Sequence, residues 1–241
     1  MRVLLAGGGS GGSATPVLAV AQALRKLEPG VEFLYVGTTG GPEAALAAAQ
    51  GIPFAGVASG KLRRYFDVQN FTDPFRVAAG VGQAYGLARR FRPHVAFSAG
   101  GFGAVPPMLA ARLVGAHALI HQQDVEPGLA NRLLAPLADV ITVSLPTSLD
   151  HFRRGLVTGN PVRSEVLAAD PRAAYLRLDL DPGAPLLVVT GGGTGALGLN
   201  RIVAAAAPRL VQVFQVLHLT GRGRGVPAAT RNGSVKFCTS K

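Results

Sequence analysis

Residues 2–12 read Arg-Val-Leu-Leu-Ala-Gly-Gly-Gly-Ser-Gly-Gly, a short apolar run that ends in a cluster of glycines. An apolar run of this length is typical of a strand buried in a parallel sheet. Pro16 favours a helix that begins at that residue, because the first turn of a helix does not need the N–H that proline lacks. The backbone N–H groups of such a loop and the helix N-terminus can bind a phosphate group. The stretch therefore predicts a Rossmann-like α/β domain that faces a phosphate-bearing ligand or substrate.

The same alternation of strand and helix continues along the chain. We expect strands over residues 2–6, 32–36, 53–57, 94–98, 117–120 and 139–143, and helices from 16, from about 42, and over about 74–91, 105–114 and 127–135. This alternation predicts a parallel sheet that is covered by helices on both faces.

A second unit follows the segment Gly-Asn-Pro-Val-Arg at 159–163, which has the composition of a hinge. It repeats the opening pattern, with Leu186–Thr190 as a strand, Gly191–Ala196 as a glycine loop, Leu199–Ala207 as a helix and Val211–Leu219 as a strand. Residues 221–241 hold five of the 24 basic residues and no acidic one, and they read as a disordered tail or as out-of-frame sequence. We therefore predict domains over 1–158 and 159–220, the second of them incomplete, and a tail over 221–241.

Composition narrows the function classes. The net charge of +11 favours anionic partners, although scattered basic residues need no partner at all. Aromatic residues make up 6% and Trp is absent, so a platform for stacking bases is not expected, and neither is a nucleic-acid partner. Cys238 is the only cysteine, which excludes an intramolecular disulfide. No apolar run reaches the roughly 18 residues that span a bilayer, and we expect a cytosolic protein.

Three glycine loops follow predicted strands. Gly7, Gly9 and Gly12 fit the dinucleotide spacing G-x-G-x-x-G, but that site needs an acidic residue at the end of the second strand, where the sequence reads Tyr-Val-Gly-Thr. A nicotinamide cofactor is therefore disfavoured. Gly191–Ala196 predicts a second phosphate-binding loop, facing the first across a cleft. Ser98–Gly103 either lines the same cleft or only allows close packing of a helix on a strand.

The segment His-Gln-Gln-Asp-Val-Glu at 121–126 places an imidazole and two carboxylates at the end of a predicted strand. Such a group can act in general acid–base catalysis. Alternatively, Asp124 or Glu126 caps the helix that follows. Because no second His or Cys lies at ligand spacing, we expect no metal site.

Basic residues lie beside aromatic residues after the third predicted strand. Ser59–Tyr65 contains three basic residues, and Phe66, Phe71 and Phe75 follow. This composition fits contact with a pyrophosphate-lipid at an anionic membrane surface. The alternative is a solvated loop beside the core face of a helix.

Taken together, these residues resemble the MurG family of glycosyltransferases. The resemblance covers residues 1 to about 220 and depends on the order and spacing of six motifs. These are the opening glycine loop with Pro16, the loop Ser59–Arg64, Gly100-Gly101, His121–Asn131, the segment 159–163 and Gly191–Ala196. It implies an α/β fold of the GT-B type, with two Rossmann-like domains facing a cleft, inversion at the anomeric carbon, and neither cofactor nor metal.

The resemblance also implies a reaction and a place in the cell. The family moves N-acetylglucosamine from UDP-N-acetylglucosamine to undecaprenyl-pyrophosphoryl-muramoyl-pentapeptide, which converts lipid I to lipid II in peptidoglycan synthesis. The implied location is the cytoplasmic face of the bacterial plasma membrane, as a peripheral protein. The residues that match the family's substrate contacts are Ser10, Gly11, Gly12, Gly101, Asp124, Asn131, Arg163 and Gly193. Of these, Arg163 suits a diphosphate, because a guanidinium can donate two parallel hydrogen bonds.

This chain departs from the family at positions that bear on catalysis. The family usually has His where Ser13 stands, Asn where Asp124 stands and Ser where Gly193 stands. The catalytic candidates are therefore Ser13, His121 and Asp124, and because serine is a poor base near neutral pH, His121 or Asp124 is favoured. The alternative is a catalytically inactive remnant, or an acceptor-binding module of the same family.

Overall fold

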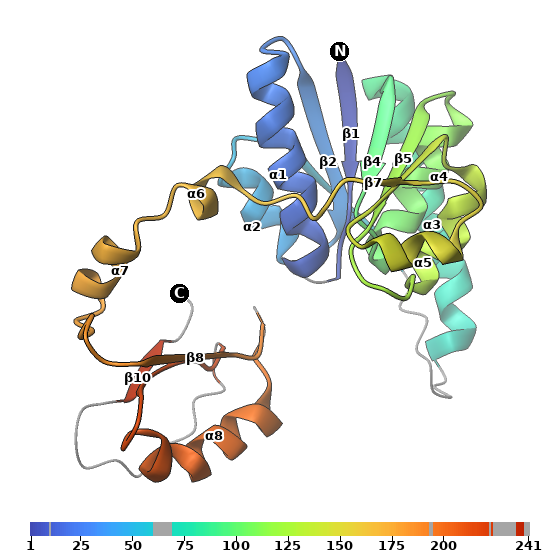
Figure 1. The fold of residues 1–241 in the computed structure, drawn as a ribbon. Coiled ribbons are helices and arrows are strands. Elements are labelled where there is room, and N and C mark those ends of the chain that lie inside the picture. Colours follow the sequence, from blue (N-terminus) through green and yellow to red (C-terminus); the bar gives the residue numbers. More distant parts are fainter. Residues whose placement is uncertain (10, 60–68, 193–194, 222, 224–234, 239–241) are drawn as a thin grey trace. The chain divides into compact units, whose positions relative to one another are not determined.

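A computed structural model of the chain describes residues 1–9, 11–59, 69–192, 195–221, 223 and 235–238 (with the side chains of 69–75 and 235–238 left out). The chain divides into two compact units, Met1–Leu167 and Ala168–Lys241 (Figure 1). The sequence predicts this boundary earlier, after residue 158. The structure assigns the segment around Arg163 to the first unit.

Unit 1 is built on a seven-stranded parallel sheet. Its strands are β1 (Arg2–Ala6), β2 (Glu32–Thr38), β3 (Phe54–Val57), β4 (Val95–Ser98), β5 (His117–Gln122), β6 (Val140–Val143) and β7 (Leu156–Val157). Their order in the sheet is β3-β2-β1-β4-β5-β6-β7, so the chain extends the sheet first on one side of β1 and then on the other. The strand order therefore reverses between β1 and β4.

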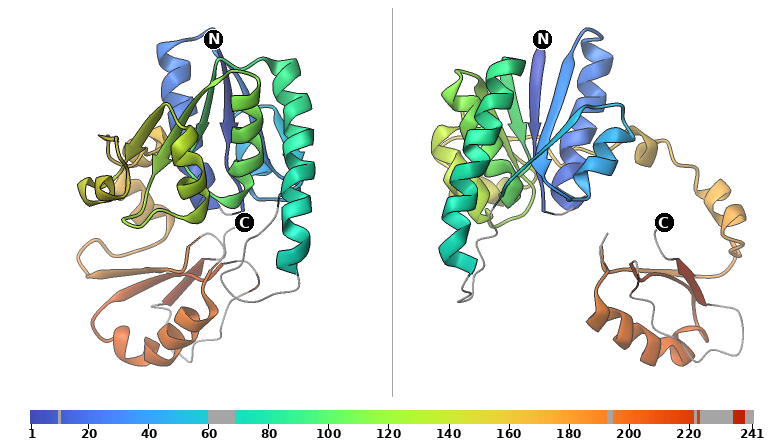
Figure 2. Two further views of the ribbon diagram at one scale, coloured as in Figure 1. Left: turned by 90° about the vertical axis from the view of Figure 1, so that its right-hand side faces the viewer. Right: turned by 180° about the vertical axis from the view of Figure 1, so that it is seen from behind.

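Helices cover both faces of this sheet, as the sequence predicts (Figure 2). The elements are α1 (Gly11–Leu27), α2 (Glu43–Ala48), α3 (Gln69–Phe91), η1 (Phe102–Ala104), α4 (Val105–Leu113), α5 (Leu129–Leu134), η2 (Ala135–Leu137), η3 (Pro146–His151) and α6 (Ser164–Leu167). Val3 and Leu5 of β1 pack towards α1 and α2, whereas Leu4 and Ala6 pack towards α3 and α4. No helix among the described residues is long and apolar enough to cross a membrane.

The first helix differs from its prediction. It begins at Gly11, five residues before Pro16, which therefore lies inside the helix. The last two glycines of the opening run form the first helical turn instead of a loop. Proline at this position removes the hydrogen bond that an N–H would give to the carbonyl of Gly12, and its ring crowds that carbonyl. The N–H groups of the first helical turn thus lie at Gly11 and the residues that follow it.

Unit 2 has a smaller parallel sheet in the order β10-β9-β8. Its elements are α7 (Pro171–Arg177), β8 (Leu186–Thr190), α8 (Leu197–Leu210), β9 (Gln215–Leu219) and β10 (Val235–Cys238). The prediction of a tail without regular structure over 221–241 is wrong at β10, which pairs with β9 from Val235 opposite Val216. Val-Lys-Phe-Cys is a run with high β-propensity, but four residues are too few to show a periodicity.

Candidate functional site

The loops after β1 and β4 meet where the strand order reverses. A Cβ atom at Gly101 would lie 2.5 Å from the carbonyl oxygen of Gly8 and 3.0 Å from Ser13 Oγ, and Gly101 has a φ of +85°. Only glycine fits this contact without strain. In open α/β sheets, ligands bind in the crevice at the carboxyl ends of the strands on either side of such a reversal. The two loops therefore mark the candidate site of unit 1.

The opening loop contains glycines of two kinds. A Cβ atom at Gly8 would lie 2.5 Å from Glu43 Oε1, so Gly8 lacks a side chain because the protein itself fills the space. A Cβ atom at Gly9 or at Gly11 would have no described atom within 4 Å, and Gly9 has a φ of +90°. The side of the loop that is open to a ligand therefore starts at Gly9.

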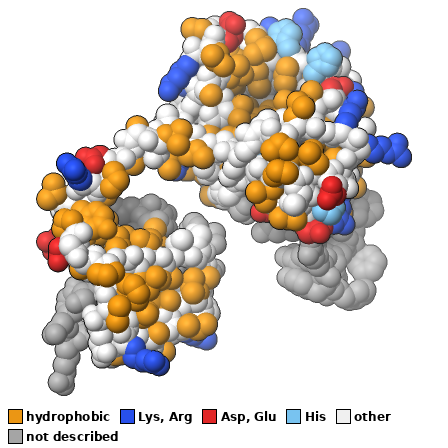
Figure 3. Space-filling model, viewed as in Figure 1, with side chains coloured by type: hydrophobic (Ala, Val, Ile, Leu, Met, Phe, Trp, Pro, Cys, Tyr) orange, Lys and Arg blue, Asp and Glu red, His pale blue; other side chains and the backbone are white. Residues whose placement is uncertain are grey.

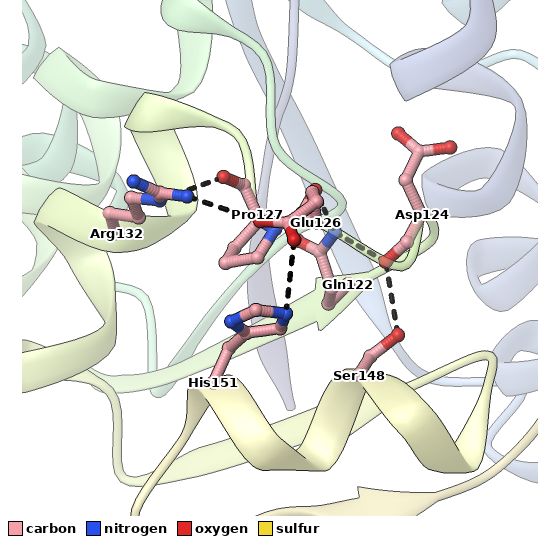
Figure 4. A network of polar contacts seen from close by, with 7 residues as sticks. All are labelled: Gln122, Asp124, Glu126, Pro127, Arg132, Ser148 and His151. Atoms are coloured by element: carbon pink, nitrogen blue, oxygen red, sulfur yellow. Dashed lines mark hydrogen bonds and ion pairs between the residues drawn. The ribbon is translucent and has the colours of Figure 1, made fainter.

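Two buried amides, Asn131 and Gln122, shape the loop after β5, and Figure 4 shows Gln122 with the carbonyls to which it donates. Asn131 Nδ2 donates to Gln122 Oε1 over 2.7 Å and to the carbonyl of His121 over 3.1 Å. Gln122 Nε2 in turn donates to the carbonyls of Asp124 (2.7 Å) and Glu126 (3.1 Å). Asn131 is only 4% exposed and holds this loop from within, and its Oδ1 is buried without a hydrogen-bond partner in the described part of the chain. Its predicted role as a substrate contact stays a prediction.

The two carboxylates of this loop differ. Asp124 is held only through its backbone carbonyl, which also accepts from Ser148 Oγ over 3.0 Å, and its carboxylate points away from the network in Figure 4. That carboxylate is exposed, and among the described residues no polar group contacts it. Glu126 instead pairs with Arg132 at 3.3 Å and with His151 at 3.7 Å. Asp124 is therefore the carboxylate of this loop that is available for chemistry.

His121 lies elsewhere than predicted. It is 1% exposed, and its ring nitrogens contact Thr142 Oγ1 at 2.9 Å and Ser144 Oγ at 3.0 Å. Burial lowers the pKa of the imidazole, against a smaller opposite effect of a hydrogen bond with Asn160. The prediction placed His121 at the mouth of a cleft because it ended the strand at residue 120. The strand continues to Gln122, so strand alternation turns His121 onto the same face as Leu119.

That face carries an apolar groove of about 340 Å³. Hydrophobic side chains gather on this face of unit 1 in Figure 3. The groove is lined chiefly by apolar residues of α1 and of the sheet strands, and it is bounded by residues 158–161. His121 is therefore a wall residue of this groove.

Ser13 and Arg163 do not come together at the opening loop. Ser13 is 7% exposed and packs against Gly101. The residues after Arg163 are tied to Gln22 of α1, which donates to Glu165 Oε1 over 2.8 Å. Gln22 lies eleven residues beyond Gly11, or about 16 Å along a helix axis. Arg163 Nε is nevertheless buried without a hydrogen-bond partner in the described part of the chain, as a donor waiting for a ligand would be.

Unit 2 has a comparable glycine loop after β8. A Cβ atom at Gly195 would overlap the carbonyl of Thr220, whereas one at Gly192, which has a φ of +77°, would have no described atom within 4 Å. Asn200 Nδ2 donates to the carbonyl of Thr220 over 2.9 Å, and His218 Nε2 lies 3.0 Å from Asn200 Oδ1. These contacts fix the ends of β8 and β9 to the start of α8.

Some predicted residues lie outside the described residues. These are Ser10, Gly193, the segment 60–68 and the side chains of Phe71 and Phe75. Gly12 lies exposed in the first turn of α1. In the parts that the structure describes, no three His, Cys, Asp or Glu side chains gather so that they could hold a metal ion.

Sequence reasoning missed Glu43, the first residue of α2. It is completely buried, and its Oε1 accepts from the backbone N–H of Thr38 over 2.8 Å. An acidic residue in a first helical turn is normally exposed, where it interacts with the helix dipole. The signal that could have identified it is the density of glycines around it, at 37, 40 and 41.

Comparisons with known proteins point to one family. Residues 3–143 match the glycosyltransferase family 28 N-terminal domain. The UDP-N-acetylglucosamine--N-acetylmuramyl-(pentapeptide) pyrophosphoryl-undecaprenol N-acetylglucosamine transferase of Lachnoclostridium phytofermentans is 40% identical over 239 residues, covering 98% of this chain and 67% of that protein. The protein of the same name from Clostridium kluyveri is 37% identical with the same coverage. The chain thus spans about two thirds of the length of these relatives. These matches extend beyond residue 221, where the sequence alone indicated no resemblance.

Solved structures share the fold. The crystal structure of Acinetobacter baumannii MurG has a TM-score of 0.64 and 24% identity, covering 99% of this chain and 67% of that chain. A UDP-GlcNAc 2-epimerase from Neisseria meningitidis, bound to UDP-GlcNAc, has a TM-score of 0.63 at 12% identity, covering 100% and 72%. These likenesses confirm the predicted α/β fold of the GT-B type.

Proposed function

Because this chain belongs to glycosyltransferase family 28 and to its MurG-type N-acetylglucosamine transferases, we propose that it transfers N-acetylglucosamine from UDP-N-acetylglucosamine to undecaprenyl-pyrophosphoryl-muramoyl-pentapeptide. The product of this step, lipid II, is a precursor of peptidoglycan. The proposed reaction is the one given in the names of relatives that are up to 40% identical to this chain.

One observation supports the proposal above the others. The loops after β1, β4 and β5 meet at the strand reversal of unit 1, since Gly101 abuts Gly8 and Gln123 Nε2 donates to the carbonyl of Ala99 over 3.2 Å. Open glycines and an unpaired carboxylate at the carboxyl ends of the strands suit a ligand that has both a diphosphate and a reacting hydroxyl.

In this reaction the acceptor's 4-hydroxyl oxygen attacks C1 of N-acetylglucosamine. A bond from that oxygen to C1 forms while the bond from C1 to the UDP oxygen breaks, with inversion. We assign the general base to Asp124, which would take the hydroxyl proton, because His121 is buried against Thr142 and Ser144. The backbone of Asp124 is fixed by Gln122 and Ser148, so the Asp124 carboxylate is carried on a rigid loop.

The departing UDP carries the electron pair of the broken bond on its diphosphate. We assign the guanidinium of Arg163 to stabilise it, because Arg163 Nε is buried without a hydrogen-bond partner in the described part of the chain. In unit 2, taken by itself, the open space at Gly192 suits the approach of a phosphate group to the backbone of the loop Gly191–Ala196. Ser10, Gly11, Gly12, Gly101 and Gly193 would approach substrate through their backbone.

We propose that the protein acts as a peripheral protein at the cytoplasmic face of the plasma membrane, where the lipid-linked acceptor would lie. The net charge of +11 supports attraction to anionic lipid. Flotation with vesicles of phosphatidylglycerol and phosphatidylcholine tests this. The chain should float with the anionic vesicles at low salt and be released by added salt. A chain that stays at the bottom of the gradient under both conditions would contradict the proposal.

Donor binding is the first experiment for the proposed reaction. Calorimetric titration of the purified chain with UDP-N-acetylglucosamine, with UDP-glucose and NAD as controls, should give selective, saturable binding. A transfer assay of wild type and Asp124→Asn should then show a loss of roughly 10²–10⁴-fold in turnover. Because the family usually has Asn at this position, unchanged turnover in this variant would remove Asp124 from the role of general base. The thermal midpoint should not change, because only the backbone of Asp124 contributes contacts. Asp150→Asn, at an exposed position of η3, is the matched control for charge.

The second candidate function is an acceptor-binding module without transferase activity. It is favoured by Ser13, which stands where the family usually has His and is 7% exposed, so the first turn of α1 offers no base. Acceptor binding without UDP-N-acetylglucosamine binding, in a protein that is folded by circular dichroism, would favour this module over the enzyme.

A further inference from the structure

The carboxyl group of Glu43 lies directly behind the opening glycine loop. The residue is 0% exposed, and Oε1 accepts from the Thr38 N–H over 2.8 Å. Oε2 is buried and has no hydrogen-bond partner in the described part of the chain. A buried polar atom without a partner is uncommon and needs an explanation. Here half of a carboxylate is left unsatisfied at the edge of the candidate site.

Glycines surround this carboxyl group. A Cβ atom added to Gly8 would lie 2.5 Å from Glu43 Oε1, and one added to Gly37 would lie 2.8 Å from Glu43 Cγ. A Cβ atom added to Gly41 would overlap the Glu43 carboxylate. Gly8 comes from the opening loop, whereas Gly37 and Gly41 lie at the end of β2 and in the turn before α2. Glu43 thus fills a space that three separate glycines leave free.

Gly8 is also in close contact with the loop after β4. A Cβ atom at Gly103 of η1 would lie 2.9 Å from Gly8 Cα, and one at Gly101 would lie 2.5 Å from the Gly8 carbonyl oxygen. The backbone of Gly8 is therefore clamped between Glu43 and the loop after β4. This leaves Gly9 and the start of α1 as the part of the loop that a ligand can approach.

The charge of Glu43 acts on its surroundings. Burial raises the pKa of the Tyr35 phenol, and the nearby Glu43 carboxylate raises it further. An anion at the opening loop would feel the same negative charge through a water-poor interior, where Coulomb interactions are stronger than in solvent.

We infer that Glu43 is a positioning residue of the opening glycine loop, which fixes Gly8 from behind and limits the affinity of the loop for an anion. The anion is the diphosphate of the acceptor, so the inference rests on the proposed function for its biological ligand. The repulsion between the buried Glu43 carboxylate and an anion at the loop should act on any diphosphate.

Titration with inorganic pyrophosphate tests the charge. Glu43→Gln keeps the shape and the acceptor for the Thr38 N–H, and it removes the charge. Pyrophosphate should bind roughly tenfold more tightly to this variant at low ionic strength, and the gain should shrink as salt is added. The thermal midpoint should stay close to that of wild type. A merely structural glutamate would leave pyrophosphate affinity unchanged, and that result would overturn the inference. So would unfolding of the variant, or absence of binding by both proteins.

A double-mutant cycle tests the position. Gly41→Ala should lower the thermal midpoint, and Glu43→Ala should relieve this loss in the double variant, because the three atoms nearest to the added methyl group all belong to Glu43. Gly30→Ala is the matched control, since its nearest atom would be 3.7 Å away. If the changes in thermal midpoint of Gly41→Ala and Glu43→Ala simply add in the double variant, the placement of Glu43 against Gly41 is overturned. A wild-type chain that binds pyrophosphate but transfers no sugar would count against the proposed function alone.

Discussion

Asn131 Nδ2 lies 2.7 Å from Gln122 Oε1, and this bond joins the first part of α5 to the last residue of β5. Both side chains are buried. Since Gln122 Oε1 accepts this bond, its Nε2 is directed to the carbonyls of Asp124 and Glu126. Position 122 therefore needs a side chain that accepts one hydrogen bond and donates two. Among the natural residues of this length, only glutamine does both.

Gln122→Glu should therefore destabilise the protein. The substitution turns a carboxylate oxygen towards two carbonyl oxygens, and we expect a loss of about 2–4 kcal/mol in the free energy of unfolding of unit 1. Urea unfolding followed by circular dichroism measures it. Gln83→Glu is the matched control, because exposed Gln83 accepts from the Ala58 N–H over 2.8 Å through its Oε1, and its Nε2 has no hydrogen bond among the described residues. Equal stability of the two variants would contradict the arrangement.

Glycine substitutions should separate ligand contact from packing. Gly11→Ala should leave stability within about 0.5 kcal/mol of wild type, because the methyl group meets no described atom and φ is not left-handed there. It should still weaken pyrophosphate binding by keeping the anion away from the loop. Gly101→Ala should instead lower stability by about 2–4 kcal/mol, through its positive φ and its contact with Gly8. Chemical unfolding and calorimetric titration of both variants decide whether the two effects separate.

His121 should make the stability of unit 1 depend on pH. Burial lowers the pKa of the folded imidazole below its ordinary value of about 6.5, so the unfolded chain binds the proton more readily. The stabilisation is complete above about pH 6.5 and is lost as the pH falls towards the folded pKa. Hydrogen exchange of the β5 and β6 amides between about pH 8 and pH 5 measures it. The stability of His121→Asn should fall less steeply with acid, and parallel profiles for the two proteins would argue against this assignment.

Arg163 should bind diphosphate through the geometry of its guanidinium and not through charge alone. Arg163→Lys keeps the charge but loses the planar fork, so UDP-N-acetylglucosamine should bind about tenfold more weakly. Arg177→Lys, at an exposed position of α7, should bind as wild type does. Calorimetric titration compares them. Unchanged affinity in Arg163→Lys would remove this residue from the proposed donor site.

The strands were the most predictable part of the fold. The predictions for Arg2–Ala6 and Leu186–Thr190 match the observed β1 and β8 residue for residue, because buried parallel strands are continuous apolar runs. Helix ends were less predictable. The sequence cue at Pro16 marked a first turn, but the glycines before it were already helical. Val235–Cys238 is a strand only because β9 offers it a partner, which no local pattern reports.

The candidate site was predictable in its position and less so in its side chains. Glycines at the carboxyl ends of strands located it, whereas the orientation of His121 depended on where β5 ends, and an error of two residues moved the imidazole to the wrong environment. The glycines at 37 and 41 beside Glu43 were a local signal, but its burial also depends on Gly8 of the opening loop, which lies far from it in the sequence. Asn131 was predicted as a substrate contact, and the structure adds a supporting role that no local pattern reports, through its bonds to Gln122 and His121.

The segment between β7 and Leu167 also determines how unit 1 can be cut out of the chain. Residues 158–161 border the apolar groove, and Gln22 bonds both to the N–H of Ser164 and to Glu165. A fragment that stops at residue 158 would lose these bonds and leave sheet residues such as Phe97 more open to water, a surface that favours aggregation. A fragment that runs to Leu167 keeps the bonds to Gln22 and the residues that border the groove. A fragment meant to fold as unit 1 should therefore extend past β7, the last strand of its sheet, to Leu167.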